Sequence, residues 1–136
     1  DRAFQQIGAT WLDGGELARR VSARGLPGVS VEAVRFTPRD PSDGKFGGVE
    51  VSGVRLRVTD PDRYDPTLTG VALLVEARRL AGDRWQWREA HFDRLAGTDE
   101  LRRGLEEGLD VGALTAEWPA QLQAFEALRS PALLYR

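Results

Sequence analysis

Few residues in this sequence have the types and spacing that covalent catalysis requires. His91 is the only histidine, and no serine occurs in a Gly-x-Ser-x-Gly turn, so a Ser-His-Asp triad is not predicted. His91 and Asp93 could form an acid/base pair, but Phe92 between them favours a packed turn with solvated neighbours. Glycoside hydrolysis needs two carboxyl groups at a set separation, and the 21 acidic residues indicate no specific pair. The sequence therefore assigns no catalytic residue to this chain.

Metal and phosphate sites are not predicted either. Asp60, Asp62 and Asp65 resemble the start of a calcium loop, but its sixth position is Asp65 instead of glycine and its twelfth is Val71 instead of glutamate. A turn and a helix cap explain these aspartates better. The glycines at positions 44, 47 and 48 precede a strand, so they lack the geometry of a phosphate cradle. We expect no metal ion and no cofactor.

Trp85 and Trp87 alternate along the chain and could stack on sugar rings, because an aromatic face suits the apolar face of a pyranose. Packing in the core explains both tryptophans as well, and it is the interpretation that we favour.

The composition indicates one folded domain. The 136 residues are 41% hydrophobic and 29% charged, with a net charge of −2 and arginines scattered among acidic residues, which argues against nucleic acid as a partner. Cysteine is absent, so neither disulfides nor thiolate metal sites form, and the redox compartment stays open. No apolar stretch approaches the roughly 20 residues of a membrane-spanning helix. Because the chain starts at Asp1 with no leader, we expect it to be a piece of a longer protein.

The elements predict an α+β fold. Asp13 and Glu16 can form a capping box for a helix from about Gly14 to Arg24, which Gly25 can end. Two strands follow, and each contains a one-residue slip in its apolar alternation, at Ala33-Val34 and at Ser52-Gly53. We expect a β-bulge near each slip, because a bulge would restore a continuous buried face.

Further helices are predicted towards the end of the chain. One opens at Pro66 and ends near Gly82, and another is capped by Thr98. The second of these is expected to direct Leu101, Leu105 and Leu109 inward. A last helical stretch has one apolar stripe and contains Pro119, which should kink it or make Trp118 its start; the stripe is Leu114, Trp118, Leu122, Phe125 and Leu128. The tail from Ala132 to Tyr135 could add an edge strand. The predicted architecture is a small curved antiparallel sheet packed against three to four helices.

The segment between the two strands is the best candidate for a functional loop. Residues 38–48 are rich in proline, aspartate and glycine, and the segment is long for a hairpin connection.

Several strings of the sequence resemble the C-terminal region of the exo-β-N-acetylmuramidase (NamZ) family. They are Gly8-Ala9-Thr10-Trp11, residues 53–60 (GVRLRVTD), residues 69–74 (TGVALL), residues 92–98 (FDRLAGT) with Leu101-Arg102, and Leu133-Leu134-Tyr135. A loop motif of Lys, aromatic, x and Gly is present as Lys45-Phe46-Gly47-Gly48. The chain departs from the family pattern at Ala3, Thr10 and Val51, where relatives often carry Pro, Pro and Cys.

The resemblance implies a two-domain peptidoglycan glycosidase that removes terminal N-acetylmuramic acid from the non-reducing end of peptidoglycan fragments. Its N-terminal Rossmann-like domain would carry the principal catalytic carboxylate, and that domain is not part of this chain. Residues 1–136 would be the C-terminal auxiliary domain that helps to wall the substrate cleft, with residues 1–10 as the remnant of the interdomain segment. The implied partners are the N-terminal domain and a muramyl sugar, and the chemistry favours a cell-envelope, periplasmic or secreted location.

Four residues are the candidates for substrate contact. We expect Lys45 and Arg2 to contact the sugar or its lactyl carboxylate, Phe46 to stack on the ring, and Glu50 to orient the substrate. A loop that only docks on the missing domain would fit as well. Two alternatives stay open, namely a stand-alone carbohydrate-binding or protein-interaction module and a domain that is catalytic alone.

Overall fold

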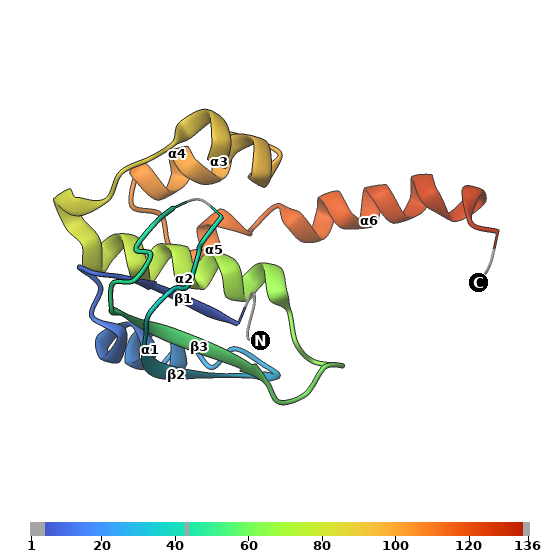
Figure 1. The fold of residues 1–136 in the computed structure, drawn as a ribbon. Coiled ribbons are helices and arrows are strands. Elements are labelled where there is room, and N and C mark those ends of the chain that lie inside the picture. Colours follow the sequence, from blue (N-terminus) through green and yellow to red (C-terminus); the bar gives the residue numbers. More distant parts are fainter. Residues whose placement is uncertain (1–4, 43, 135–136) are drawn as a thin grey trace. The chain divides into compact units, whose positions relative to one another are not determined.

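The structure, a computed structural model, describes residues 5–42 and 44–134 of the chain. The chain divides into two compact units, Asp1–Trp87 and Arg88–Arg136. Figure 1 traces the elements of each unit along the sequence. The predicted α+β class is confirmed, since a small antiparallel sheet is combined with helices.

The first unit contains the sheet. Its elements in chain order are β1 (Gln6–Ala9), α1 (Gly14–Ser22), β2 (Val29–Phe36), β3 (Val51–Val58), α2 (Pro66–Ala81) and the short 3-10 turn η1 (Gly82–Arg84). The strands are antiparallel in the order β1-β3-β2, so β3 is central. Strand β1 was not predicted from its four residues, and it lies inside the segment expected to join two domains.

The predicted starts of the first two helices are confirmed, and both helices end within two residues of the predicted position. Asp13 Oδ1 accepts a hydrogen bond from the Glu16 backbone N–H at 3.0 Å, and Asp65 caps α2 in the same way. Helix α1 ends at Ser22, two residues earlier than expected, and Gly25 then adopts a φ of 64°. Helix α2 ends at Ala81, and its C-cap residue Gly82 has a φ of 53°. The local capping residues therefore determine where these helices begin and end.

The predicted β-bulges are wrong. Every residue of β2 faces one residue of β3, from Val29 opposite Val58 to Phe36 opposite Val51, without an extra residue on either strand. Because the register is continuous, Val51 and Val54 lie on opposite faces of the sheet, and they are 1% and 0% exposed. The slip in the pattern marks a place where both faces of β3 are buried, and a bulge is not needed.

Close backbone packing explains the glycine at this point of β3. A Cβ atom on Gly53 would lie 1.9 Å from the carbonyl oxygen of Ile7 in β1. A Cβ atom on Gly14, at the start of α1, would lie 2.2 Å from the carbonyl oxygen of Gly53. The Gly14 N–H also donates a hydrogen bond to Ser52 Oγ at 3.0 Å. The start of α1 therefore lies directly on the central strand.

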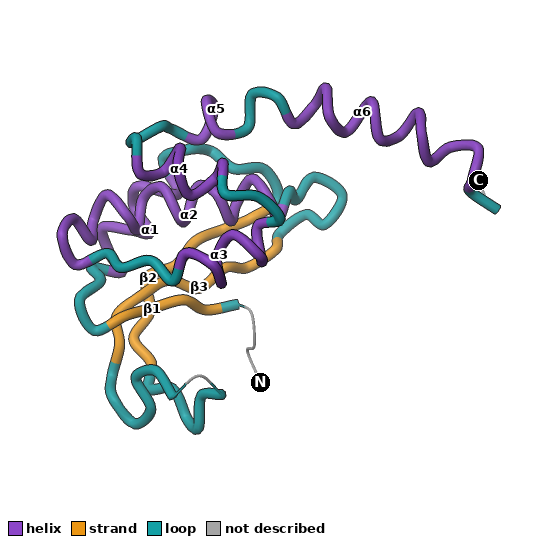
Figure 2. The backbone as a smooth tube through the Cα atoms, turned by 90° about the horizontal axis from the view of Figure 1, so that it is seen from above, coloured by secondary structure: helices purple, strands orange, loops and turns teal. Residues whose placement is uncertain are grey.

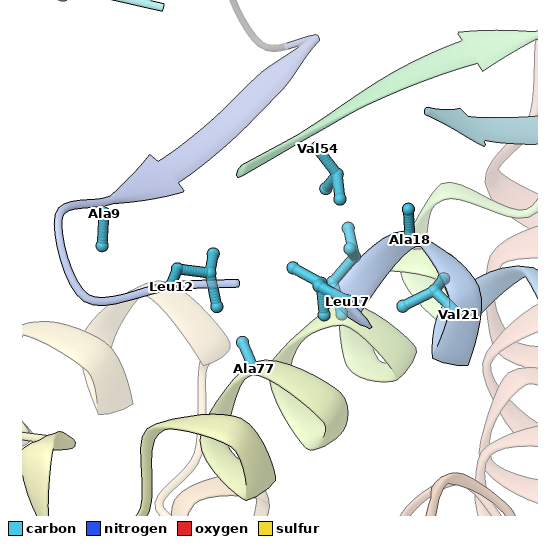
Figure 3. Close-up of a cluster of buried hydrophobic side chains, with 8 residues drawn as sticks. Ala9, Leu12, Leu17, Ala18, Val21, Val54 and Ala77 are labelled. Atoms are coloured by element: carbon cyan, nitrogen blue, oxygen red, sulfur yellow. The ribbon is translucent and has the colours of Figure 1, made fainter. Parts of the chain in front are cut away.

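A single hydrophobic cluster joins the sheet to α1 and α2. It consists of Ala9, Leu12, Leu17, Ala18, Val21, Val54, Leu73 and Ala77. Figure 3 shows Leu17, Ala18 and Val21 of α1 between Val54 of β3 and Ala77 of α2. Both helices therefore contribute to a core on one face of the sheet.

A buried ion pair also connects α1 with α2. Glu76 of α2 is 5% exposed, and its carboxylate accepts hydrogen bonds from Arg24, just after α1, and from Arg79. Arg20 lies 3.8 Å away. Removal of the carboxylate would leave a cluster of arginines without its counter-charge, so Glu76 has a structural role.

In the described part of the second unit, residues 88–134, the regular elements are all helices. They are α3 (Glu89–Ala96), α4 (Glu100–Glu106), α5 (Val111–Leu114), α6 (Trp118–Arg129) and the 3-10 turn η2 (Ser130–Ala132). Helix α3 was expected to be a turn. Arg102 of α4 donates two hydrogen bonds of 2.9 Å to Asp93 of α3, and this ion pair raises the pKa of the Arg102 guanidinium. The pair ties α3 to α4.

The helix ends and the tail of the second unit agree with the sequence predictions in part. The Thr98 hydroxyl accepts from the Glu100 N–H as expected, and Leu105 is buried, but Leu109 lies beyond the end of α4 and is 40% exposed. Trp118 starts α6 as Pro119 predicted. The edge strand expected in the tail does not form between Ala132 and Leu134, because Ala132 belongs to η2 and the next two residues are irregular. Tyr135 lies outside the described residues. Within residues 5–42 and 44–134, no helix combines the length and apolar composition that crossing a bilayer requires.

Candidate functional site

The loop that the sequence singled out connects β2 to β3 and spans residues 37–50. Figure 2 shows it as a teal segment that extends beyond the ends of the strands. Three backbone hydrogen bonds fold it, from Gly48 N to Pro38 O, from Gly44 N to Pro41 O and from Val49 N to Phe46 O, with lengths of 2.9 to 3.0 Å. The described residues of the loop therefore form a series of turns without a helix or strand.

Among the described residues of this 37–50 loop, two that are not glycine have a left-handed backbone. Phe46 has a φ of 55° and Asp40 a φ of 44°. The left-handed conformation costs a non-glycine residue about 1–2 kcal/mol, and aspartate tolerates it better than a bulky residue. Strain of this kind persists where surrounding contacts hold it, and it gathers at functional sites. Phe46 is thus the strained position of the loop.

The side chain of Phe46 explains what holds this conformation. The ring is partly buried and packs against the hydrophobic cluster of the first unit. Trp11 and Trp85 pack against the same cluster. Phe46 therefore anchors the tip of the loop, and only part of its ring is accessible for stacking.

Lys45 and Glu50 are both exposed on the same loop. Lys45 is the only lysine in a sequence with 19 basic residues. Glu50 forms an ion pair with Arg35 of β2, with 3.2 Å between Arg35 Nη1 and Glu50 Oε1. Arg2, the fourth residue predicted to contact substrate, lies outside the described residues. The structure thus places Lys45, Phe46 and Glu50 on one ordered loop.

Three tryptophans form an aromatic cluster in the first unit. The ring of Trp85 makes edge-on contacts with Trp11, at 6.4 Å between centroids, and with Trp87, at 5.2 Å. The packing role favoured for Trp85 is confirmed by its contact with the hydrophobic cluster. Trp11 was missed as a member, because it is remote in sequence and only the tertiary fold brings it to Trp85. Trp85 Nε1 is buried and has no hydrogen-bond partner among the described residues.

The other clusters considered from sequence have structural partners. His91 Nδ1 lies 3.1 Å from Arg94, whereas Asp93 binds Arg102, so His91 and Asp93 face different arginines. Asp60 accepts a hydrogen bond from the Asp62 N–H, and Asp65 caps α2. These groups stabilise helices and turns, as the simpler interpretation of the aspartates predicted.

A shallow pocket lies elsewhere in the first unit. It has a volume of about 540 Å³ and is lined by Val21, Ser22, residues 25–31, Thr59 and Arg63. Val29 and Val58 pair at this end of β2 and β3, whereas the 37–50 loop begins at the opposite end, after Phe36. Lys45, Phe46 and Glu50 do not line this pocket.

Comparison with known proteins supplies the family. The profile described as exo-β-N-acetylmuramidase NamZ, C-terminal, matches residues 1–135. The peptidoglycan β-N-acetylmuramidase NamZ of Bacillus subtilis (strain 168) is 30% identical over 135 residues, which cover 98% of this chain and 32% of that protein. The crystal structure of a DUF1343 family protein from Bacteroides fragilis matches with a TM-score of 0.82 at 22% identity, over 98% of this chain and 35% of that one. The chain thus spans about a third of the length of either relative. From the profile match along almost its whole length, the chain belongs to the NamZ family and corresponds to its C-terminal domain.

Proposed function

We propose that this chain is the auxiliary domain of an exo-acting glycosidase that removes terminal N-acetylmuramic acid from peptidoglycan fragments. The observation that carries the proposal is the family match over residues 1–135. In the proposal the chain works within a longer polypeptide, called the parent protein below. The region that the relatives carry outside this domain would supply the catalytic carboxylate, because the chain spans only about a third of their length.

The carboxylates of this chain support an auxiliary role. A glycosidase needs one carboxyl group that donates a proton and a second that acts as base or nucleophile. Glu76, the buried carboxylate of the first unit, is held by arginines, and Asp93 of the second unit is held by Arg102. Such groups are committed to ion pairs that hold helices together.

The 37–50 loop is the part of the chain that we assign to the substrate cleft. Lys45 would pair with the lactyl carboxylate, which distinguishes muramic acid from glucosamine, because an ammonium group is a strong partner for a carboxylate. The accessible part of the Phe46 ring would contact the sugar, and Glu50 would orient it through its hydroxyl groups. Arg2 stays a predicted second contact to the carboxylate.

An activity assay on two proteins tests the proposal. The parent protein and the 136-residue chain are each incubated with a chromogenic N-acetylmuramide, and released N-acetylmuramic acid is measured. We expect release by the parent protein and none by the chain alone. An inactive parent protein would overturn the proposal, and so would hydrolysis by the chain alone. If the parent is inactive but the chain shows localised NMR shifts in residues 38–50 with muramyl sugars, the chain is a stand-alone binding module.

A further inference from the structure

Helix α6 carries large apolar side chains that are exposed in the second unit. Every described residue from Pro119 to Leu134 is exposed, including large apolar side chains. These are Leu122 at 62% exposure, Phe125 at 57%, Leu128 at 79%, Leu133 at 49% and Leu134 at 89%. Isolated exposed leucines are ordinary on protein surfaces, but a continuous group of this kind marks an interaction site.

The spacing places the apolar side chains of α6 on one side of the helix. Leu122, Phe125 and Leu128 recur every three residues, so at 100° per residue they lie within about a third of the helix circumference. Gln123 and Glu126 fall outside this sector. Leu122, Phe125 and Leu128 are called the α6 stripe below; Gln121 and Arg129 lie in the same sector, and Gln123, outside it, can serve as a control.

The length of α6 indicates that the stripe needs a partner. The helix has 12 residues, and isolated helices of this length are only marginally stable in water. Most helices of folded proteins are stabilised by packing of their apolar face. Within the second unit, the described contact on the α6 stripe is that of the Arg129 guanidinium, 5.9 Å from the centre of the Phe125 ring, so we look for its partner outside this unit.

The charges on α6 argue against a membrane surface as that partner. Helices that bind anionic lipids carry several lysines or arginines on the polar side. Helix α6 has one basic residue, Arg129, and this residue is already paired with Glu126 at 2.7 Å. The surroundings of the stripe are thus close to neutral, as suits an apolar protein surface.

We propose that the α6 stripe docks on the region that the relatives carry outside this domain. That region makes up about two thirds of each relative, and α6 lies within the part of the chain that the family profile matches. The inference rests on the proposed function, because it places the same region beside this domain in the parent protein.

Hydrogen exchange of the α6 amides tests the docking. Exchange is followed by mass spectrometry in the parent protein and in the chain alone, with Leu122→Glu as the disrupting variant and Gln123→Glu as its matched control. We expect residues 118–129 to exchange on the order of 100-fold more slowly in the parent protein than in the chain. Leu122→Glu should remove this protection, and Gln123→Glu should preserve it.

The outcomes separate this proposal from the function on which it rests. Equal exchange in the two proteins would overturn the docking, even if the parent protein released N-acetylmuramic acid. Protection that depends on α6 in an inactive parent protein would support the docking and overturn the proposed activity. If protection appears in the chain alone with rising concentration, and sedimentation shows a dimer that Leu122→Glu dissociates, the stripe binds a second copy and the proposal is wrong.

Discussion

The carboxylate of Glu50 lies 3.2 Å from the guanidinium of Arg35 at the base of the 37–50 loop. Arg35 belongs to β2 and Glu50 directly precedes β3, so the pair links the two ends of the loop. The Arg35 side chain is 74% exposed and the Glu50 side chain is 62% exposed. An ion pair this exposed contributes little to stability, so Glu50 can exchange Arg35 for a substrate group at small cost.

Replacing Glu50 by Gln should therefore separate binding from folding. The unfolding free energy of the chain should change by less than about 0.5 kcal/mol in urea titrations. In the parent protein, loss of a charged hydrogen bond to the sugar should raise the KM about 10-fold. Arg35→Gln is the matched control, because it breaks the same ion pair and removes no proposed sugar contact. An equal rise of KM in both variants would mean that Glu50 acts only through Arg35.

The backbone of Phe46 gives a stability test that does not depend on function. Phe46→Ala and Phe46→Gly both remove the ring, but glycine also relieves the strain of a φ of 55°. We expect the glycine variant to be more stable than the alanine variant by about 1 kcal/mol in urea unfolding. If Phe46→Ala were more stable than Phe46→Gly, the loop would not keep this backbone conformation in solution.

The close contact between β1 and β3 should make Gly53 intolerant of any side chain. In Gly53→Ala the added Cβ would collide with the backbone of Ile7, which cannot move without opening the β1–β3 pair. A loss of about 3 kcal/mol in unfolding free energy is expected. Gly70→Ala in α2 is the control, since a Cβ there meets nothing within 4 Å, and it should stabilise the helix by up to about 1 kcal/mol. Similar effects of the two changes would contradict the packing described here.

Glu16 on α1 should give the stability of the chain a pH dependence. Hydrogen bonds from Arg19 and then Arg20 lower the pKa of its carboxyl from 4.5 to about 2. The folded state thus favours the ionised form, and this stabilisation is complete above the unfolded pKa and is lost as the pH falls from 4.5 towards 2. Glu16→Gln should lower the Tm at pH 7, by a small amount because the pair is exposed, and its effect should shrink as the pH approaches 2. Thermal melts followed by circular dichroism measure this difference, and a difference that stays constant with pH would rule out the ion pair as its cause.

Local signals in the sequence predicted much of the fold, and tertiary contacts account for what they missed. Asp13, Asp65 and Pro119 mark helix starts because capping and proline act within one turn of the chain. The slip at Ser52-Gly53 was misinterpreted because its cause is burial on both faces of β3. The alternation of apolar and polar residues along a strand does not reveal that both faces of the sheet are buried at one position.

In the candidate site, too, local features could be predicted from the sequence and tertiary contacts could not. The composition of residues 38–48 predicted an irregular loop, which is confirmed for its described residues, and three backbone hydrogen bonds fold it into turns. The contact of Phe46 with the core and the pairing of Trp11 with Trp85 could not be predicted, because each joins segments far apart in the chain. The ion pair of Glu50 with Arg35 depends on the register of β2 and β3, which the expected bulges would have shifted.

Lys45 is the only lysine in the sequence, so its chemical reactivity tests most directly whether the 37–50 loop belongs to the substrate cleft. The rate of acylation of Lys45 by an amine-reactive ester is measured in the parent protein by peptide mass spectrometry, with N-acetylmuramic acid, with N-acetylglucosamine or with no sugar. We predict that saturating N-acetylmuramic acid slows the reaction about 10-fold, because its lactyl carboxylate occupies the ammonium group, and that N-acetylglucosamine, which lacks this carboxylate, does not. An unchanged rate with N-acetylmuramic acid would contradict the assignment of the 37–50 loop to the substrate cleft.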